Sequence, residues 1–245
     1  MKRPATGWAA LATSVALWSA TPLHAAPGTL APLAGASAQP QPPWHLSGLP
    51  HQSKPFTQFR IEDWRGQRAL RIEADHSYGN LVHLLSGGQD SHHLAWTWTL
   101  DEPNTQADLH AKSREDEALR VCVLFDLPHE RVPLLERAML AMAHTDGGDP
   151  VPGATVCYVW DSHLPPGTAL HSPYTGRIRM LVLRGPEAPL HQWAPESRDI
   201  AADFKQLFGD ESDTVPPVLG VAVGGDADNT QAHSLAHLGG LTLSP

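Results

Sequence analysis

The sequence predicts an all-β sandwich that carries two short helices. Most of the chain past residue 44 consists of short segments that are apolar or that alternate polar with apolar residues, as half-buried strands do. Clusters of turn-forming residues separate these segments, and the chain contains 20 glycines and 23 prolines. Only two segments space their apolar residues as a helix does. Many strands and few helices favour two packed sheets.

Nine segments are predicted to be strands. In an extended chain, Leu70, Ile72 and Ala74 project to one side, and Arg71 and Glu73 project to the other. The predicted strands are residues 57–63, 68–75, 79–86, 93–101, 118–126, 154–161, 177–185, 218–225 and 234–243.

Two segments are predicted to be helices, residues 131–144 and residues 197–209. In the second, Ser197 is a candidate N-terminal cap, Asp199 lies in the first turn, and Gly209 ends the helix.

The first 25 residues are typical of a secretory signal peptide. Lys2 and Arg3 precede an apolar stretch over residues 8–20, and Ala25 offers a cleavage point. Residues 26–43 are rich in Ala, Pro and Gly and are predicted to be a flexible leader. We therefore expect one domain over residues 44–245 and export to a bacterial periplasm or beyond the cell.

Charge and composition bear on the class of partner. The formal net charge is −9, and no basic stripe is present, so nucleic acid and anionic membranes are poor partners. No segment after the signal is long and apolar enough to insert into a membrane. No cofactor is predicted. The sequence does not indicate an oligomeric state.

Two tryptophans share one face of a predicted strand. Leu94, Trp96, Trp98 and Leu100 alternate with smaller residues over residues 93–101. Aromatic side chains on a sheet can stack on sugar rings. Because two leucines occupy the same face, a position in the core is favoured over an exposed platform.

The two cysteines, Cys122 and Cys157, each lie inside an apolar strand-like run. A disulfide between them is plausible in an exported protein and requires the two strands to be neighbours. Two buried free thiols remain the alternative. A zinc site is disfavoured because neither cysteine has a second ligand at the usual spacing.

The segment GGDADNTQ follows an apolar run near the end of the chain and offers Asp226, Asp228 and Asn229. It does not fit an EF-hand, which needs a Gly and a Glu at positions where Gln231 and His237 stand. A calcium site shared with other loops stays possible, as does a simple turn.

Three further positions are candidates for buried or pocket-lining charge. Arg120 enters an apolar strand, and an inward guanidinium would need a carboxylate, for which Asp116 is the nearest candidate. Tyr174 and Arg179 flank a turn and a strand that could line a pocket mouth.

Motifs for nucleophilic or zinc-dependent hydrolysis and for nucleotide binding are absent from the sequence. The 15 histidines include no pair with a third ligand at zinc-like spacing. Carboxylates such as Asp226 and Asp228 could serve a glycosidase only if they faced a second acid across a cleft. No catalytic residue is therefore assigned.

Several short motifs, in a fixed order, resemble a family of exported bacterial proteins known as domain of unknown function 3047. They are W-T-W (96–98), R-V-C-V-L-F (120–125), Y-V-W-D (158–161), P-Y-T-G-R (173–177), E-S-R-D-I (196–200) and D-A-D-N-T (226–230). The resemblance covers about residues 44–240.

The resemblance implies a single jelly-roll-like sandwich of the galactose-binding-like type, a class that often binds carbohydrate. Cys122 and Cys157 depart from the family pattern together, which favours a disulfide. The polar positions that match the family's motifs are Lys112, Asp116, Arg120, Trp160, Tyr174, Arg179, Trp193, Arg198, Asp199, Asp203, Asp226, Asp228 and Asn229.

These observations favour a periplasmic module that binds a carbohydrate or another polar small ligand, rather than an enzyme. The alternatives are a structural or interaction protein of the cell envelope and a glycan-active enzyme using Asp226 or Asp228 with Asp116. The expected ligand-binding residues are Asp116, Arg120, Trp160, Tyr174, Arg179, Asp226, Asp228 and Asn229.

Overall fold

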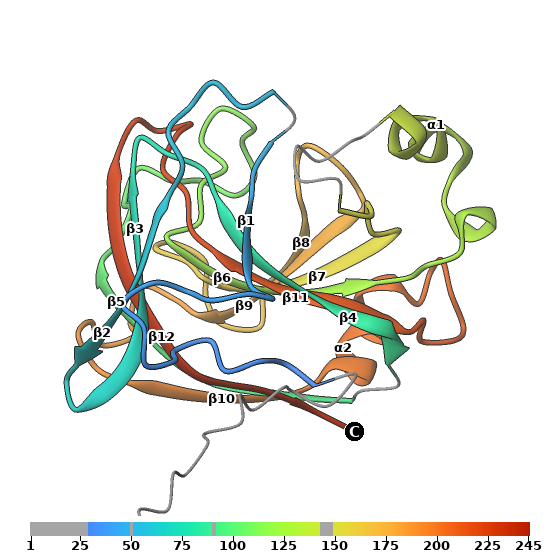
Figure 1. Ribbon diagram of the computed structural model, residues 1–245. Helices are drawn as coiled ribbons and strands as arrows, with labels where there is room; N and C mark the ends of the chain where they lie inside the picture. The colour runs from blue at the N-terminus through green and yellow to red at the C-terminus, as the bar shows by residue number, and fades with distance from the viewer. Residues whose placement is uncertain (1–28, 50, 90–91, 143–148) are drawn as a thin grey trace, which may run out of the picture.

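Two β-sheets packed face to face form the body of the protein (Figure 1). The structure is a computed structural model that describes residues 29–49, 51–89, 92–142 and 149–245. The predicted signal peptide and residues 26–28 of the predicted leader lie outside the described residues.

The larger sheet has seven strands. Its spatial order is β1 (His45–Ser47), β4 (Asn80–Gln89), β11 (Val218–Gly224), β6 (Leu119–Phe125), β7 (Ala154–Trp160), β9 (Ile178–Arg184) and β8 (Ala169–His171). Every pairing in it is antiparallel except that of β7 with β9, so this sheet is mixed.

The smaller sheet has five antiparallel strands. They are ordered β10 (Ala194–Asp199), β5 (His93–Glu102), β12 (His233–Ser244), β3 (Gln67–Asp75) and β2 (Gln58–Trp64). The successive strands β4, β5 and β6 alternate between the two sheets, as they do in jelly-roll-like sandwiches. The predicted all-β sandwich with two α-helices is confirmed.

The core fills the space between the sheets. Leu70 and Ile72 of β3 point into it, as the alternation predicted, and so do Trp96 and Trp98 of β5. The expectation that these two tryptophans belong to the core is confirmed, since they are at most 2% exposed. Each fully buried side chain of this size contributes roughly 1.5–3 kcal/mol of transfer free energy.

Alternation along β6 gives the larger sheet two different faces. Val121 and Val123 join the main core, whereas Cys122 belongs to a second apolar cluster on the opposite face. Val82 of β4 and Ala222 of β11 lie in the same second cluster. This outer face carries the candidate site described below.

Both helices begin three residues later than predicted, and the predicted end of the first lies outside the described residues. α1 (Leu134–Met142) follows a 3-10 turn, η1 (His129–Arg131), and α2 (Ile200–Phe208) packs Phe204 against Phe125 at 4.8 Å between ring centroids. Ser197 does not cap α2. Asp199 caps it, because its Oδ1 accepts hydrogen bonds from the main-chain N–H of Ala201 and Ala202. The residues before Asp199 form the edge strand β10 instead.

Part of the predicted leader packs against the sandwich. Leu33 is 3% exposed and joins the core, and the indole of Trp44 donates to the carbonyl of Ala31. The guanidinium of Arg68 holds three main-chain carbonyls of residues 35–37. The packed chain therefore begins before Trp44. Neither helix among the described residues reaches the length and apolarity needed to cross a bilayer.

Candidate functional site

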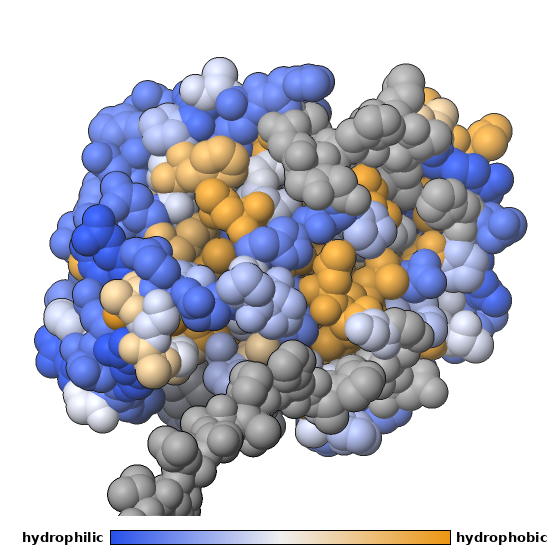
Figure 2. All heavy atoms as spheres, viewed as in Figure 1, coloured by the Kyte–Doolittle hydropathy of each residue, from blue (hydrophilic) through white to orange (hydrophobic). Residues whose placement is uncertain are grey.

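A cavity of about 400 Å³ opens on the outer face of the seven-stranded sheet. Its floor is apolar and is built by side chains of β4, β11, β6, β7 and β9, namely Val82, Ala222, Cys122, Leu124, Cys157 and Ile178. Figure 2 shows hydrophobic residues gathered over β7 and β11 in the middle of this face. The volume falls within the range of small-molecule sites.

A disulfide joins two strands in this floor. Cys122 of β6 and Cys157 of β7 are direct register partners, and their sulfurs are bonded at 2.07 Å. The predicted disulfide is confirmed. Both cysteines occupy positions of their strands that face the cavity rather than the main core. The bond therefore fixes the spacing of the two central floor strands.

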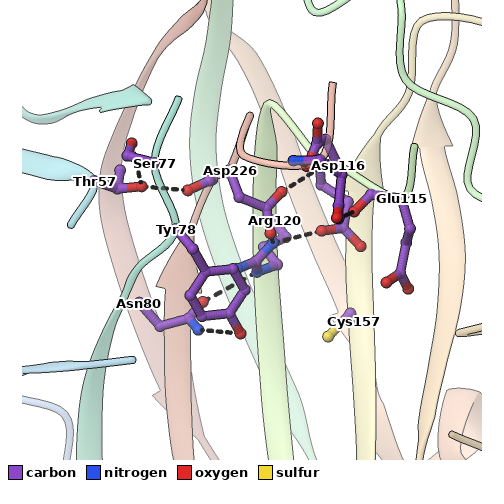
Figure 3. A network of polar contacts seen from close by, with 12 residues as sticks. Thr57, Ser77, Tyr78, Asn80, Glu115, Asp116, Arg120, Cys157 and Asp226 are labelled. Atoms are coloured by element: carbon purple, nitrogen blue, oxygen red, sulfur yellow. Dashed lines mark hydrogen bonds and ion pairs between the residues drawn. The ribbon is translucent and has the colours of Figure 1, made fainter. Parts of the chain in front are cut away.

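Arg120 closes one end of the floor (Figure 3). It stands on the same face of β6 as Cys122 and is only 5% exposed. Its Nη1 donates to Asp226 Oδ2 at 2.7 Å and also to the carboxylate of Glu117. Its Nε donates to Asn80 Oδ1 at 3.0 Å, and its guanidinium lies 5.2 Å from the ring centre of Tyr78.

One cation therefore serves two buried carboxyl groups. Burial alone would lower the pKa of Arg120, but Asp226 and Glu117 raise it well above its usual value. Burial raises the pKa of Asp226 and of Glu117, although Arg120 opposes both shifts. Because one guanidinium cannot balance two charges away from water, the pair of carboxyls holds on to a proton to higher pH.

Asp116 holds the GGDADNTQ loop. Its Oδ1 accepts from the N–H of Asn229 at 3.1 Å, and its Oδ2 accepts from the N–H of Thr230 at 2.8 Å and from the Thr230 hydroxyl. The side-chain amide of Asn229 donates to the carbonyl of Glu115 at 2.9 Å. The loop after β11 is thus tied to the segment before β6. Asp116 is not the partner of Arg120, contrary to the sequence-based expectation.

Two carboxyl groups at the same end of the cavity have fewer partners. Glu115 accepts from the hydroxyl of Ser172 at 2.6 Å, and burial raises the pKa of Glu115 to about 7. Asp228 is 8% exposed, and burial raises its pKa as well. Its buried Oδ1 accepts no hydrogen bond from any described residue. Tyr174 stands at the rim, and its hydroxyl donates to the carbonyl of Lys112.

The structure brings together most of the residues expected from the sequence. Arg120, Tyr174, Asp226, Asp228 and Asn229 line the cavity, and Asp116 lies directly behind them. Tyr78, Asn80 and Glu117, which also contact Arg120, were not predicted from the sequence. Glu117 stands three residues before Arg120, and that spacing was its only signal.

Two expected residues lie elsewhere. Trp160 is 2% exposed and packs in the core beside Trp98, with ring centroids 5.7 Å apart. Arg179 is held by Asp210 at 2.6 Å and by Glu211, beyond the end of α2, with its guanidinium 4.2 Å from the ring centre of Phe208. Neither residue lines the cavity.

Three carboxylates of the site are close enough to share a cation. Each of Asp116, Asp226 and Asp228 has an oxygen within 4.8 Å of the others'. Asp116 and Asp226, however, already accept hydrogen bonds from main-chain N–H groups, and Asp226 also binds Arg120. A calcium ion would have to displace these donors, so this trio is better suited to hold the loop than to hold a metal.

A second cavity, of about 460 Å³, lies beside β1 and β2. Arg60 and His45 are its only basic or titratable lining residues in the part of the chain that the structure describes. It gathers no charged network. The cavity with Arg120 is therefore the stronger candidate site.

Comparison of the sequence with protein families shows the family to which this chain belongs. The sequence profile described as "Protein of unknown function (DUF3047)" matches residues 42–242. The chain belongs to the DUF3047 family. The match spans β1 to β11 and all but the last two residues of β12 in this DUF3047 protein, and it includes every residue that lines the cavity. No curated protein matches the chain.

Solved structures resemble this DUF3047 protein only distantly. An endo-1,4-β-glucanase, CelB2, is 10% identical with a TM-score of 0.39, covering 81% of this chain and 99% of that one. Endoglucanase 3 of Trichoderma harzianum, from family GH12, is 8% identical with a TM-score of 0.37, covering 83% and 97%. The xyloglucanase domain of NopAA from Sinorhizobium fredii, solved with cellobiose, is 8% identical with a TM-score of 0.38, covering 82% and 96%. The fold assignment rests on the sheet pairings themselves.

Proposed function

We propose that this DUF3047 protein binds a carbohydrate or another polar small ligand in the cavity on the outer face of the seven-stranded sheet. The observation that carries the proposal is a pair of buried polar atoms. Arg120 Nη2 and Asp228 Oδ1 are both buried, both belong to residues that line the cavity, and neither has a hydrogen-bond partner among the described residues.

An unpartnered buried polar atom is unfavourable by about 1–3 kcal/mol, and more when it belongs to a charged group. A ligand that meets both atoms relieves this. Arg120 Nη2 can only donate, and an ionised Asp228 Oδ1 can only accept. A hydroxyl group does both, so a ligand with neighbouring hydroxyls satisfies the two atoms together.

The rest of the cavity suits one side of such a ligand. Its floor of Val82, Cys122, Cys157 and Ala222 offers aliphatic and sulfur surface. Sugar rings present C–H groups on one face and hydroxyls at the edge. The apolar floor would contact the C–H face of the ring, while the ionic end of the cavity would bind its hydroxyls.

Thermal-shift titration of the purified protein with neutral disaccharides and polyols tests this proposal. A true ligand at about 100 times its Kd stabilises the folded state by about 2.7 kcal/mol, which raises the Tm by several degrees. Asp228→Asn should remove the response and leave the Tm of the free protein nearly unchanged, because its Oδ1 has no partner to lose.

Asp213→Asn is the matched control, since Asp213 is exposed and does not line the cavity. It should respond as the unchanged protein does. If no saccharide or polyol raises the Tm, or if Asp228→Asn responds fully, the proposal fails.

A glycan-active enzyme is the second candidate, and Glu115 favours it. A carboxyl group with a pKa of about 7 in a cavity is suited to donate a proton near neutral pH. Asp116 and Asp226, considered from the sequence as catalytic acids, are engaged in holding the loop and Arg120. Release of reducing sugar that stops in Glu115→Gln would support an enzyme. Saturable binding without turnover supports a binding protein.

A structural role of the polar network is the third candidate. Asp116 and Arg120 connect the loop after β11 to β6 and to the segment before it, and such contacts can stabilise the fold without any role in ligand binding. In that case Asp116→Asn lowers the Tm and no ligand is found. Export is part of the main proposal, supported by the predicted signal peptide and by a disulfide, which persists in oxidising compartments.

A further inference from the structure

We propose that the ligand of this cavity carries a protonated amine next to hydroxyl groups, as an amino sugar does, and that the amine binds between Glu115 and Asp228. This inference rests on the proposed function and names the class of ligand. It follows from which charges in the cavity already have partners and which do not.

The lining of the cavity is strongly acidic. Among the described residues, five carboxylate side chains and one basic side chain line it, and none of these lining residues is a lysine or a histidine. The acidic residues are Glu115, Glu117, Asp149, Asp226 and Asp228, and the basic one is Arg120. A cavity with this imbalance favours a cation, because its low-dielectric walls concentrate the field of the carboxylates.

Three of the five carboxylates already contact a basic side chain. Glu117 and Asp226 share Arg120, and Asp149 contacts the ring of His45 at 2.8 Å. Glu115 and Asp228 form no ion pair with any lysine, arginine or histidine side chain in the described part of the chain. They are the two carboxylates left for a ligand.

These two carboxylates lie at the same end of the cavity. Asn229 follows Asp228 in the chain, and its side-chain amide binds the carbonyl of Glu115 at 2.9 Å. Both carboxyls act on the hydroxyl of Tyr174, where burial and then the charge of Glu115 raise the pKa, with Asp228 adding to the shift. An ammonium group has three N–H donors, which allows it to bind more than one carboxylate.

The groups around Glu115 and Asp228 explain why a ligand must supply the cation. Burial raises the pKa of Glu115 and the charges of Asp226 and Asp116 add to the shift, while the hydrogen bond from Ser172 and the charge of Arg120 oppose it. Lys54 lies near Asp228, but its Nζ contacts the main-chain carbonyl at 3.4 Å. Lys112 stands over the ring of Tyr174 at 5.6 Å and is exposed.

Arg120 requires the ligand to carry a hydrogen-bond acceptor close to its amine. An oxygen of Asp228 lies within 4.8 Å of one of Asp226, and Asp226 binds Arg120. The unpartnered Arg120 Nη2 therefore requires an acceptor close to the cation. A hydroxyl on the carbon next to an amine meets this requirement, and a simple alkylamine does not.

In the free protein, a proton on Glu115 compensates for the absence of a cation. Burial raises the pKa of Glu115 to about 7, so a fraction of the molecules carry a proton there at neutral pH. An amine that arrives as a cation favours the ionised carboxylate and releases that proton. Binding of an amine should therefore release protons, and binding of a neutral sugar should not.

Three disaccharides with the same β-1,4 linkage separate the possibilities in isothermal titration at about pH 6, where the sugar amines are already protonated and Glu115 still carries its proton in most molecules. Chitobiose carries an amine at position 2 of each ring, N,N'-diacetylchitobiose carries a neutral amide there, and cellobiose carries a hydroxyl. We expect chitobiose to bind at least about tenfold more tightly than cellobiose, a difference of about 1.4 kcal/mol. Repeating the titration in buffers of different ionisation enthalpy counts the protons released.

Glu115→Gln should reduce the preference for chitobiose to less than about threefold and abolish proton release, while cellobiose binding stays nearly unchanged. Glu187→Gln is the matched control, because Glu187 is exposed and does not line the cavity. It should keep the full preference. If both variants lose the preference equally, general attraction to an acidic protein explains it, and the inference is wrong.

The remaining outcomes separate the inference from the proposed function. Equal binding of all three sugars contradicts the proposed preference for an amine but is consistent with a binding site in this cavity. No binding of any of them, together with no response to polyols, overturns the proposed function itself. If chitobiose binds only when calcium is present, a metal rather than an amine occupies the acidic end, which also contradicts the inference.

Discussion

Arg120 and Asp226 form a buried ion pair across 106 residues of sequence, with Arg120 Nη1 lying 2.7 Å from Asp226 Oδ2. Arg120 is the second residue of β6, and Asp226 follows the end of β11, the neighbour of β6 in the sheet. The side chains of both are less than 8% exposed. This pair fixes the GGDADNTQ loop against the floor of the cavity.

Removing the cation should strongly destabilise the protein. Arg120→Met leaves Glu117 and Asp226 buried without their partner, and breaking a buried pair in this way typically lowers the free energy of unfolding by about 3–5 kcal/mol. The loss should be smaller at pH 5 than at pH 8, because the two carboxyls can then take up protons. Urea denaturation at both pH values measures it.

Arg114→Met is the control for that substitution. Arg114 pairs with Asp108 on the surface, where its side chain is 54% exposed, and such pairs contribute less than about 1 kcal/mol. A loss of similar size for both arginines would mean that the pair of Arg120 and Asp226 adds nothing beyond a surface contact.

The disulfide should stabilise the fold substantially. Cys122 and Cys157 are 35 residues apart, and closing a loop of that length lowers the entropy of the unfolded chain enough to contribute about 4 kcal/mol. The double substitution to alanine should lower the Tm by an amount that a reducing agent reproduces in the unchanged protein. Equal Tm values with and without reductant would show that the bond does not constrain the chain.

Glu115 should give the protein an unusual dependence on pH. Its pKa is about 7 in the folded protein and 4.5 ordinarily, so the folded state binds more protons between these values. The contribution of Glu115 to stability is then fully present below about pH 4.5 and falls as the pH rises to about 7.

Glu115→Gln should remove that slope. Relative to the unchanged protein, the variant should gain about 1–2 kcal/mol between pH 4.5 and 8, a value discounted for the partial exposure of the side chain. Guanidinium denaturation across this range provides the comparison. Parallel curves for the two proteins would mean that Glu115 titrates normally.

The start of α2 offers a direct comparison between two candidate caps. Asp199 accepts two main-chain N–H groups there, and Ser197 lies two residues earlier, in β10. Asp199→Ala should lower the Tm by about 2–4 °C, and Ser197→Ala should change it little. The reverse order in a thermal melt would show that the helix begins earlier.

Apolar runs and alternating hydrophobicity were enough to predict nine of the twelve strands among the described residues, each within a few residues of its observed bounds. The three strands it missed, β1, β8 and β10, are all edge strands. Two of them have only three residues, and β10 has no buried residue. An edge strand is held by main-chain pairing with one neighbour, and that leaves little pattern in its sequence.

The candidate site was predicted less completely. Polar residues at the ends of apolar strands need partners, and this allowed the prediction of four residues that line the cavity, Arg120, Asp226, Asp228 and Asn229. Trp160 did not lie in the cavity because alternation separates the two faces of a strand but does not say which face meets the core. Glu117 was missed because its contact with Arg120 depends on how the chain turns into β6.

A cavity-filling variant tests the central claim, that this cavity holds the ligand, most directly. Ala222 lies on β11 in the floor, and Ala222→Leu fills part of the space. Thr242→Leu adds a side chain of the same size at an exposed position of β12 in the other sheet. In isothermal titration with chitobiose and cellobiose, Ala222→Leu should weaken binding at least about tenfold while Thr242→Leu binds as the unchanged protein does. Full binding by a folded Ala222→Leu protein would contradict the claim.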